Sequence, residues 1–183
     1  MTARDANPGV GPTSKQLAAL VRKGARFQPG LVAPRNLEKS AREAAILILF
    51  GDASAGSSRS SRASRFSRSG SQGGFAPVDS DLLLLRLTDD LSHHPGQIAF
   101  PGGGKDPEDR SATAAALREA HEETRLDPSS VDVAGELDRV FLPNSNNLVT
   151  PVLGSWEARP ALVPDGTETA EVFRVPTPEL LDP

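Results

Sequence analysis

The sequence predicts an α+β fold, or an α/β/α sandwich, built around a mixed β-sheet. Several short segments are apolar throughout or alternate between apolar and polar residues, as strands do. A long helix rich in alanine is predicted near the middle of the chain, from Ser111 onward. A second helix is predicted to begin at Thr177, close to the end. With 183 residues the chain is long enough for one domain with a hydrophobic core, and a single domain is expected.

Residues 1–36 are predicted to form an N-terminal extension, and residues 37–183 the domain itself. Within the extension, Ser14 to Arg26 has the apolar spacing of a short helix. Six segments of the domain are predicted strands: Ala44–Phe50, Asp81–Thr88, Val131–Leu137, Val140–Leu142, Leu148–Trp156 and Glu171–Val175. Because proline cannot donate a ladder hydrogen bond, Pro151 is expected to place its strand near an edge or a bulge.

The segment from about residue 51 to residue 77 differs from the rest of the chain. It is dominated by serine, glycine and arginine, and no acidic residue stands between Asp52 and Asp79. Such a composition cannot bury enough apolar surface to fold, so we predict a disordered insertion in a loop between two adjacent strands. The alternatives are a phosphorylation target or a basic arm that contacts nucleic acid or an acidic partner.

The overall composition excludes several classes of protein. A net charge of −4 argues against a general nucleic-acid binder. The chain has no run of about 18 apolar residues, so no membrane-spanning helix and no membrane partner are expected. It begins without the apolar core of a signal peptide and contains no cysteine, which rules out disulfides and thiolate metal sites. These features favour a cytoplasmic protein.

Three glutamates of the central helix, Glu119, Glu122 and Glu123, fall on one face at about 100° per residue. Their like charges repel one another, and they stand toward the C-terminal end of the helix, where the helix dipole disfavours anions. Bound Mg²⁺ or Mn²⁺ would relieve this conflict, because both ions prefer oxygen ligands. For an arbitrary helix rich in glutamate, a solvated acidic face would be the simpler interpretation.

A glycine-rich segment just before the helix favours the metal site. Residues 100–104, with the sequence FPGGG, are predicted to form a loop in which glycine allows close approach of the backbone. Pro128 is expected to end the helix. His93 and His94 raise a zinc hypothesis that the spacing to other ligands does not support, and His121 is interpreted as a packing or surface residue.

These residues resemble the signature of the Nudix hydrolase family, G-x5-E-x7-R-E-U-x-E-E-x-G-U, in which U is aliphatic. Its second half is matched in order by Arg118, Glu119, Ala120, Glu122, Glu123 and Leu126. Two positions depart from the signature. Arg110, with Asp109 beside it, stands in place of the first glutamate, and Arg125 stands in place of the late glycine.

Both departures are similar to those of one branch, the coenzyme A pyrophosphatases. That branch also has an upstream pattern resembling L-L-x-x-R-…-H-x-G-Q-[VI]-A-F-P-G-G. The chain follows it at Leu82, Leu83, Arg86 and His94, and from Gly96 to Gly103. It departs at Leu87, where serine is usual, and at Ser92, where arginine is usual, and it is one residue longer between Arg86 and Gly96.

The resemblance implies a Nudix fold and a set of site residues. Metal ligands would be Glu119, Glu123 and Glu122; catalytic residues would be Glu122, Arg118 and Glu168; and substrate would contact Arg86, His94, Gln97, Gly102 and Gly103. Glu136 is a second candidate for the general base. The family usually continues through another strand and helix, so either a shortened chain or a fragment is expected, and a homodimer stays open.

The expected activity is that of a metal-dependent Nudix pyrophosphohydrolase using Mg²⁺ or Mn²⁺. By resemblance, its substrate is a nucleoside diphosphate of the coenzyme A type, cleaved to 3′,5′-ADP and 4′-phosphopantetheine or its acyl form. The first alternative is a Nudix hydrolase of ADP-ribose, NADH or a nucleoside triphosphate. The second is a catalytically weak binding or regulatory protein.

Overall fold

The structure is a computed structural model, and it describes residues 17–19, 21–22, 40–52, 80–92, 94–156 and 161–181. Predictions that fall elsewhere, including nearly all of the serine- and arginine-rich insertion and His93, lie outside the described residues. Residues 17–19 and 21–22 are helical, which confirms this part of the helix predicted from Ser14 to Arg26. Leu17 is fully buried.

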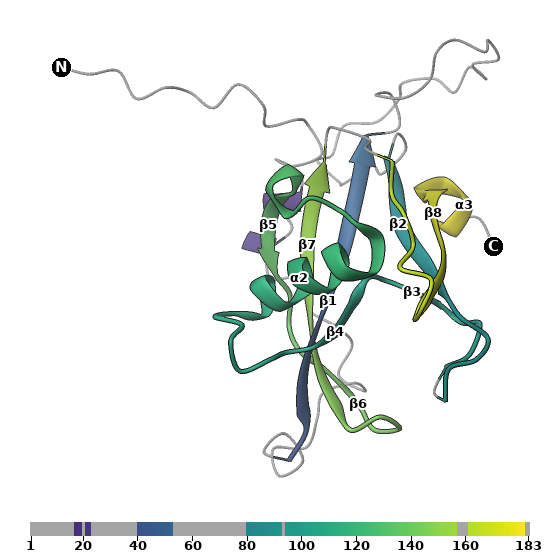
Figure 1. Cartoon of the computed structure of the whole chain (residues 1–183). Coiled ribbons are helices and arrows are strands. Elements are labelled where there is room, and N and C mark those ends of the chain that lie inside the picture. The colour runs from purple at the N-terminus through teal and green to yellow at the C-terminus, as the bar shows by residue number, and fades with distance from the viewer. Residues whose placement is uncertain are drawn as a thin grey trace.

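In the described part of the chain, eight strands form one mixed sheet, and a long helix crosses one face of it (Figure 1). The strands are β1 (Arg42–Asp52), β2 (Ser80–Leu87), β3 (Ile98–Ala99), β4 (Gly102–Gly104), β5 (Asp132–Glu136), β6 (Val140–Leu142), β7 (Asn147–Trp156) and β8 (Thr169–Pro176). The helices are α2 (Ala112–Thr124), α3 (Thr177–Leu181) and the 3₁₀ turn η3 (Pro128–Ser130). The predicted α+β fold is confirmed. None of the described helices has the length and apolarity needed to cross a bilayer.

The centre of the sheet is the pair β1 and β7, which run parallel from Arg42 opposite Asn147 to Gly51 opposite Trp156. The other pairings are antiparallel: β2 and β4 pair with β1, β5 and β6 with β7, and β3 and β8 with β2. Since β1 pairs with β2, the insertion connects adjacent strands of one sheet, as predicted.

Strand β7 does not lie at an edge, because β1 flanks it on one side and β5 and β6 on the other. Of the two predicted positions for Pro151, the edge is therefore wrong, and the irregularity of the pairing between β5 and β7 lies between Val133 and Gly135 and not opposite Pro151. Pro151 stands between the stretch of β7 that pairs with β6 and the stretch that pairs with β5, and its carbonyl oxygen accepts a hydrogen bond of 2.9 Å from the Leu137 amide. The break between two partner strands thus accommodates the missing N–H of proline.

Helix α2 supplies the middle of the core through small side chains. Ser111 caps its N-terminus by accepting a hydrogen bond of 3.0 Å from the Ala114 amide. Buried Ala115, Ala116 and Ala120 then pack against apolar residues of β1 and β7, which include Ala45, Leu47, Leu49, Val152 and Trp156. These small side chains bring the helix close to the sheet.

The helix ends earlier than expected. It stops at Thr124, and Arg125 adopts the left-handed conformation with φ of +60°. Pro128 is therefore not what ends it; Pro128 instead begins the 3₁₀ turn. His121, which is exposed, has its Nδ1 2.8 Å from the Leu126 carbonyl oxygen and so lies at the helix terminus as a surface residue.

The three glycines after Pro101 form strand β4 rather than a loop. They pair with Ala44, Ala45 and Ile46 of β1. Gly102 has φ of +154°, and a Cβ atom there would lie 2.4 Å from the Ala45 carbonyl oxygen. Only glycine allows this close antiparallel approach, so the pairing partner decides a conformation that the local sequence does not favour.

Candidate active site

Strand β4 lies directly against the glutamates of α2. The Gly102 amide donates a hydrogen bond of 2.9 Å to Oε2 of Glu123. A Cβ atom on Gly103 would lie 2.6 Å from the carboxyl carbon of Glu119, so glycine is what leaves room for that group. Of the two glycines predicted to contact substrate, Gly102 therefore binds one predicted metal ligand and Gly103 leaves room for another.

Arg118 connects the glutamates to the segment before the helix. Its Nη1 lies 3.1 Å from Oε1 of Glu119 and 3.1 Å from Oε2 of Glu122. Its Nη2 donates hydrogen bonds of 2.9 Å to the Gly104 carbonyl oxygen and to Oδ2 of Asp109. Arg118 thus pairs with Glu122, four residues further along the helix, and the same guanidinium also pairs with Glu119.

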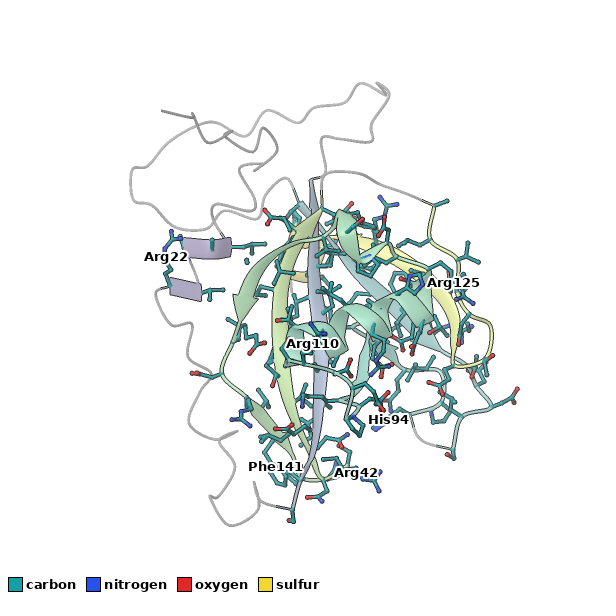
Figure 2. All side chains as sticks on the ribbon, turned by 60° about the vertical axis from the view of Figure 1, so that its left-hand side comes forward. Arg22, Arg42, His94, Arg110, Arg125 and Phe141 are labelled. Carbon is teal, nitrogen blue, oxygen red and sulfur yellow. The ribbon has the colours of Figure 1, made fainter. Side chains whose placement is uncertain are left out.

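Of the four acidic partners of Arg118, Asp109 has the least exposed side chain. Its side chain is only 8% exposed, and both of its carboxylate oxygens lie 3.3 Å from Nε of Arg118. The hydrogen bonds from Arg118 hold the pKa of Asp109 below its usual value. Arg110, which stands in the signature position, is exposed, and Figure 2 shows it beside the beginning of α2. The acidic group that meets Arg118 is thus supplied one residue earlier.

The surroundings of Glu119 and Glu123 disfavour the charged forms of both carboxylates. Burial raises the pKa of Glu119 although Arg118 lies beside it. Burial also raises the pKa of Glu123 to about 7, against the lowering effect of the hydrogen bond from Gly102. Repulsion from Glu119, Glu168 and Asp165 adds to the rise for Glu123. Four carboxylates therefore share one neighbourhood in which a further cation would be stabilised.

The two candidate general bases lie in different places. Glu168 is exposed and close enough to raise the pKa of Glu123, so the structure brings it to the carboxylate cluster. Oε1 of Glu136 instead accepts hydrogen bonds from the Thr113 amide at 3.2 Å and from the Thr113 hydroxyl at 2.9 Å. Glu136 therefore serves the N-terminal turn of α2.

The predicted substrate residues outside β4 lie along β2 and the loop that follows it. His94 has φ of +57°, and its Nδ1 is 2.9 Å from Oε1 of Gln97 (His94 is labelled in Figure 2). Arg86 pairs with Asp89 at 3.2 Å. Because side chains alternate along a strand, Arg86 points to the face opposite Leu83, which packs in the α2 core. The structure thus groups His94 with Gln97 and directs Arg86 away from the α2 face.

Residues 71–183 match the model of the NUDIX domain, which is more than half of the chain. The chain belongs to the NUDIX family. The match covers β2, the glycine strand, helix α2 and all later elements.

Two curated relatives are similar to this NUDIX chain. An uncharacterized Nudix hydrolase NudL of Pectobacterium atrosepticum is 46% identical over 101 residues, which are 54% of this chain and 50% of that protein. The peroxisomal coenzyme A diphosphatase NUDT7 of Mus musculus is 41% identical over 102 residues, which are 56% of this chain and 43% of that protein. The chain matches about half the length of these relatives or less.

Solved structures confirm the Nudix fold. A Nudix hydrolase from M. Smegmatis, RenU, superposes with a TM-score of 0.54 at 21% identity, over 78% of this chain and 74% of that one. An Ap4A hydrolase of C. elegans superposes with a TM-score of 0.53 at 15% identity, over 76% of this chain and 83% of that one. At these identities the likeness concerns the fold alone.

The donor groups of this NUDIX site suit a divalent cation, although their present positions do not yet form a coordination shell. Glu119, Glu122 and Glu123 offer only hard oxygen ligands, and two of them have a raised pKa from burial and neighbouring charge. Among the described residues, however, no three acidic or histidine side chains converge closely enough to hold one ion. Ion pairing to Arg118 holds Glu119 and Glu122 in these positions. Binding an ion therefore requires those side chains to rotate.

The sequence patterns do not identify two residues that the structure brings to the site. The contact of Asp106 with Arg118, at 3.5 Å, and the nearness of Asp165 to Glu123 both join segments that are separate in the sequence. Aspartate in a loop rich in glycine and proline is usually explained by turn formation. Only the approach of these loops to α2 distinguishes them.

Proposed function

We propose that the chain is a divalent-metal-dependent Nudix pyrophosphohydrolase that cleaves the diphosphate of coenzyme A or an acyl-coenzyme A. The observation that carries the proposal is the buried carboxylate of Glu123, which accepts a hydrogen bond from Gly102 of β4 and whose pKa is raised by burial and by the charges of Glu119 and Glu168. The similarity to the coenzyme A diphosphatase NUDT7 supports the substrate class. The chain has no cysteine and a net charge of −4, which fits a cytoplasmic enzyme acting on a small molecule.

Glu119, Glu123 and Glu122 are the residues that would hold the ion, either Mg²⁺ or Mn²⁺. When bound, such an ion polarises phosphoryl oxygens and makes a water molecule easier to deprotonate. The amide of Gly102 fixes one oxygen of Glu123, whereas Glu119 and Glu122 would have to rotate away from Arg118 to reach the ion.

Glu168 is proposed to act as the general base. Its carboxylate would take a proton from the attacking water as the new P–O bond forms, and the bridging P–O bond of the diphosphate would break. The products from coenzyme A are 3′,5′-ADP and 4′-phosphopantetheine. The exposure of Glu168 and its nearness to Glu123 support this role. His94, Gln97, Arg86 and the backbone at Gly102 and Gly103 are proposed on the substrate side.

The test is product analysis by chromatography with coenzyme A, ADP-ribose, NADH and dATP, each with Mg²⁺ or Mn²⁺. We expect 3′,5′-ADP from coenzyme A. Turnover of another compound instead would keep the Nudix chemistry and replace the substrate, since Leu87 and Ser92 depart from the branch pattern. If the folded protein turns over none of these compounds, the alternative of a catalytically weak binding or regulatory protein would be favoured.

Glu119→Gln and Glu123→Gln test the site within that assay. Each variant removes a charged ligand while keeping the side-chain shape, so kcat is expected to fall by about 100-fold or more. Glu179→Gln, on the exposed side of α3, is the matched control and should keep wild-type turnover. Near-normal activity of Glu123→Gln would disprove the proposed ligand.

A further inference from the structure

One carboxylate organises the segment that carries Glu168. Oδ1 of Asp165 accepts hydrogen bonds from three successive backbone amides, those of Thr167 at 3.1 Å, Glu168 at 3.2 Å and Thr169 at 2.8 Å. The Gly166 amide also donates to the Thr169 carbonyl oxygen at 3.1 Å. Asp165 therefore closes a tight turn in which the backbone of Glu168 is one of the bound groups.

The same turn is hydrogen-bonded to the C-terminal end of helix α2. The Asp165 amide donates a hydrogen bond of 3.1 Å to the Glu123 carbonyl oxygen, and the Val163 amide donates one of 3.0 Å to the Thr124 carbonyl oxygen. A helix leaves its last carbonyl groups without partners inside the helix, and here the segment before β8 uses two of them. Asp165 is thus fixed relative to Glu123 through its own main chain.

Thr88, which follows strand β2, holds the backbone of Glu168 through further hydrogen bonds. The Thr88 amide donates a hydrogen bond of 2.9 Å to the Glu168 carbonyl oxygen, and the Thr88 hydroxyl donates one of 3.2 Å to the Thr167 carbonyl oxygen. Both backbone groups of Glu168 are therefore engaged, while its side chain stays exposed. The position of the Glu168 backbone is therefore fixed, and its exposed carboxylate is accessible to a substrate or a water molecule.

We propose that Asp165 is a positioning residue that fixes the backbone of Glu168 relative to the C-terminal end of α2, so that its carboxylate is held ready to take a proton from the attacking water. The inference rests on the proposed role of Glu168 as the general base. Because Oδ1 of Asp165 is engaged by three backbone amides, we assign it a role through these hydrogen bonds and the link to α2, and no contact with the reacting atoms. A displacement of a catalytic group by about 1 Å can cost about 100-fold in rate, so such a residue affects kcat more than substrate binding.

The test is a double-mutant cycle of Asp165→Ala and Glu168→Gln with coenzyme A as substrate. Asp165→Ala alone is expected to lower kcat by about 10- to 100-fold with KM within about twofold of wild type. In the Glu168→Gln background the same substitution should change kcat by less than about twofold. Equal losses of kcat in both backgrounds would overturn the proposal, because Asp165 would then act independently of Glu168.

Two further variants, Asp165→Asn and Asp127→Ala, distinguish the positioning of Glu168 from a general loss of protein stability. Asp165→Asn keeps an oxygen that accepts amide hydrogen bonds, so it should restore kcat to within about threefold of wild type. Asp127 caps η3 by accepting a hydrogen bond of 2.9 Å from the Ser129 amide, and Asp127→Ala should leave kcat unchanged. If Asp165→Asn were as slow as Asp165→Ala, hydrogen bonding would not be the cause and the proposal would fail.

Amide hydrogen exchange gives a readout that needs no substrate. In Asp165→Ala the amides of residues 167–169 should exchange faster than in wild type, while those of the β1–β7 pair stay protected. Unchanged exchange at these amides would overturn the proposal. If wild type fails to cleave coenzyme A but exchange responds as expected, the proposed substrate fails and the positioning contact stands; the cycle is then run with the substrate that is cleaved.

Discussion

At the scale of single residues, Arg125 is one of three described non-glycine residues with a positive φ, the others being His94 and Asn146. It terminates α2 with φ of +60°, a conformation that costs a residue with a Cβ atom about 1 kcal/mol relative to glycine. Its amide still donates to the His121 carbonyl oxygen at 2.9 Å, so the cap itself is formed. Figure 2 shows Arg125 at the far end of the helix from Arg110.

We therefore expect Arg125→Gly to be more stable than Arg125→Ala by about 1 kcal/mol, which corresponds to roughly 2–4 °C in Tm for a chain of this size. Both variants lose the same charge, so their difference isolates the backbone. Urea unfolding measures it. Arg110→Gly is the reverse control: Arg110 has no positive φ, so glycine there should be neutral or destabilising. Equal stability of the two Arg125 variants would contradict the argument.

At the scale of elements, the segment between β4 and α2 is joined to the helix through Arg118 and Asp109. We expect Asp109→Asn to lower the free energy of unfolding by about 1 kcal/mol, because Arg118 then loses one of its four carboxylate partners, the one whose side chain is least exposed. Asp106→Asn is the matched control, since Asp106 is 61% exposed and lies 3.5 Å from Arg118, and its loss should be smaller.

The pH dependence of that loss provides a check. The pKa of Asp109 is lowered by folding, so its contribution to stability is complete above the pKa of an unfolded aspartate, about 4. It is lost as the pH falls through the lower folded pKa. The difference between wild type and Asp109→Asn, measured by denaturant unfolding, should therefore shrink below pH 4. A difference that stays constant down to pH 3 would mean that charge pairing is not its source.

At the scale of the whole molecule, the carboxylate cluster makes the metal-free protein less stable at higher pH. The pKa of Glu123 is about 7 in the folded state against 4.5 for an unperturbed glutamate, so the folded state binds more protons between these values. Stability is then largest below about pH 4.5 as far as this group is concerned, and it falls as the pH rises to about 7, by on the order of 2 kcal/mol.

Urea midpoints between pH 5 and pH 8 in the presence of a chelator measure this trend. Glu123→Gln should flatten it, because the amide does not ionise, whereas Glu179→Gln should leave it unchanged. Glu119→Gln should have a smaller effect in the same direction, since burial raises the pKa of Glu119 as well. A wild-type midpoint that rises steadily over this range would refute the argument.

Much of this molecule could be predicted from local patterns, and the remainder depends on contacts between distant segments. The apolar runs of β1 and β2 and the alanine-rich stripe of α2 specify those elements through burial alone. The glycine strand could not be predicted, because its conformation comes from pairing with β1. Pro151 is accommodated by a break between β5 and β6 that lies outside its own segment.

The candidate site divides in the same way. Glu119, Glu122 and Glu123 could be predicted because helical periodicity places them on one face, and the pairing of Arg118 with Glu122 follows from their spacing. Asp165 could not be recognised, because its significance comes from the Glu123 carbonyl oxygen to which its amide is bound. In the sequence, Asp109 stands out only as the neighbour of Arg110, which departs from the family signature. Its role becomes clear from the hydrogen bond that it accepts from Arg118.

The parallel pairing of β1 with β7 has a consequence for how the chain folds. Its partners, such as Ala44 and Val149, stand about a hundred residues apart in the sequence, so the central ladder closes the largest loop in the described sheet. Hairpin-like pairs such as β6 with β7 form from near neighbours and require little loop closure. The ladder at the middle of the sheet is therefore expected to form late, and refolding should be slow relative to a helical protein of this size. Until this ladder forms, the apolar residues of β1 are not stably buried against β7. The chain is then most prone to aggregation, because that apolar surface is exposed to solvent.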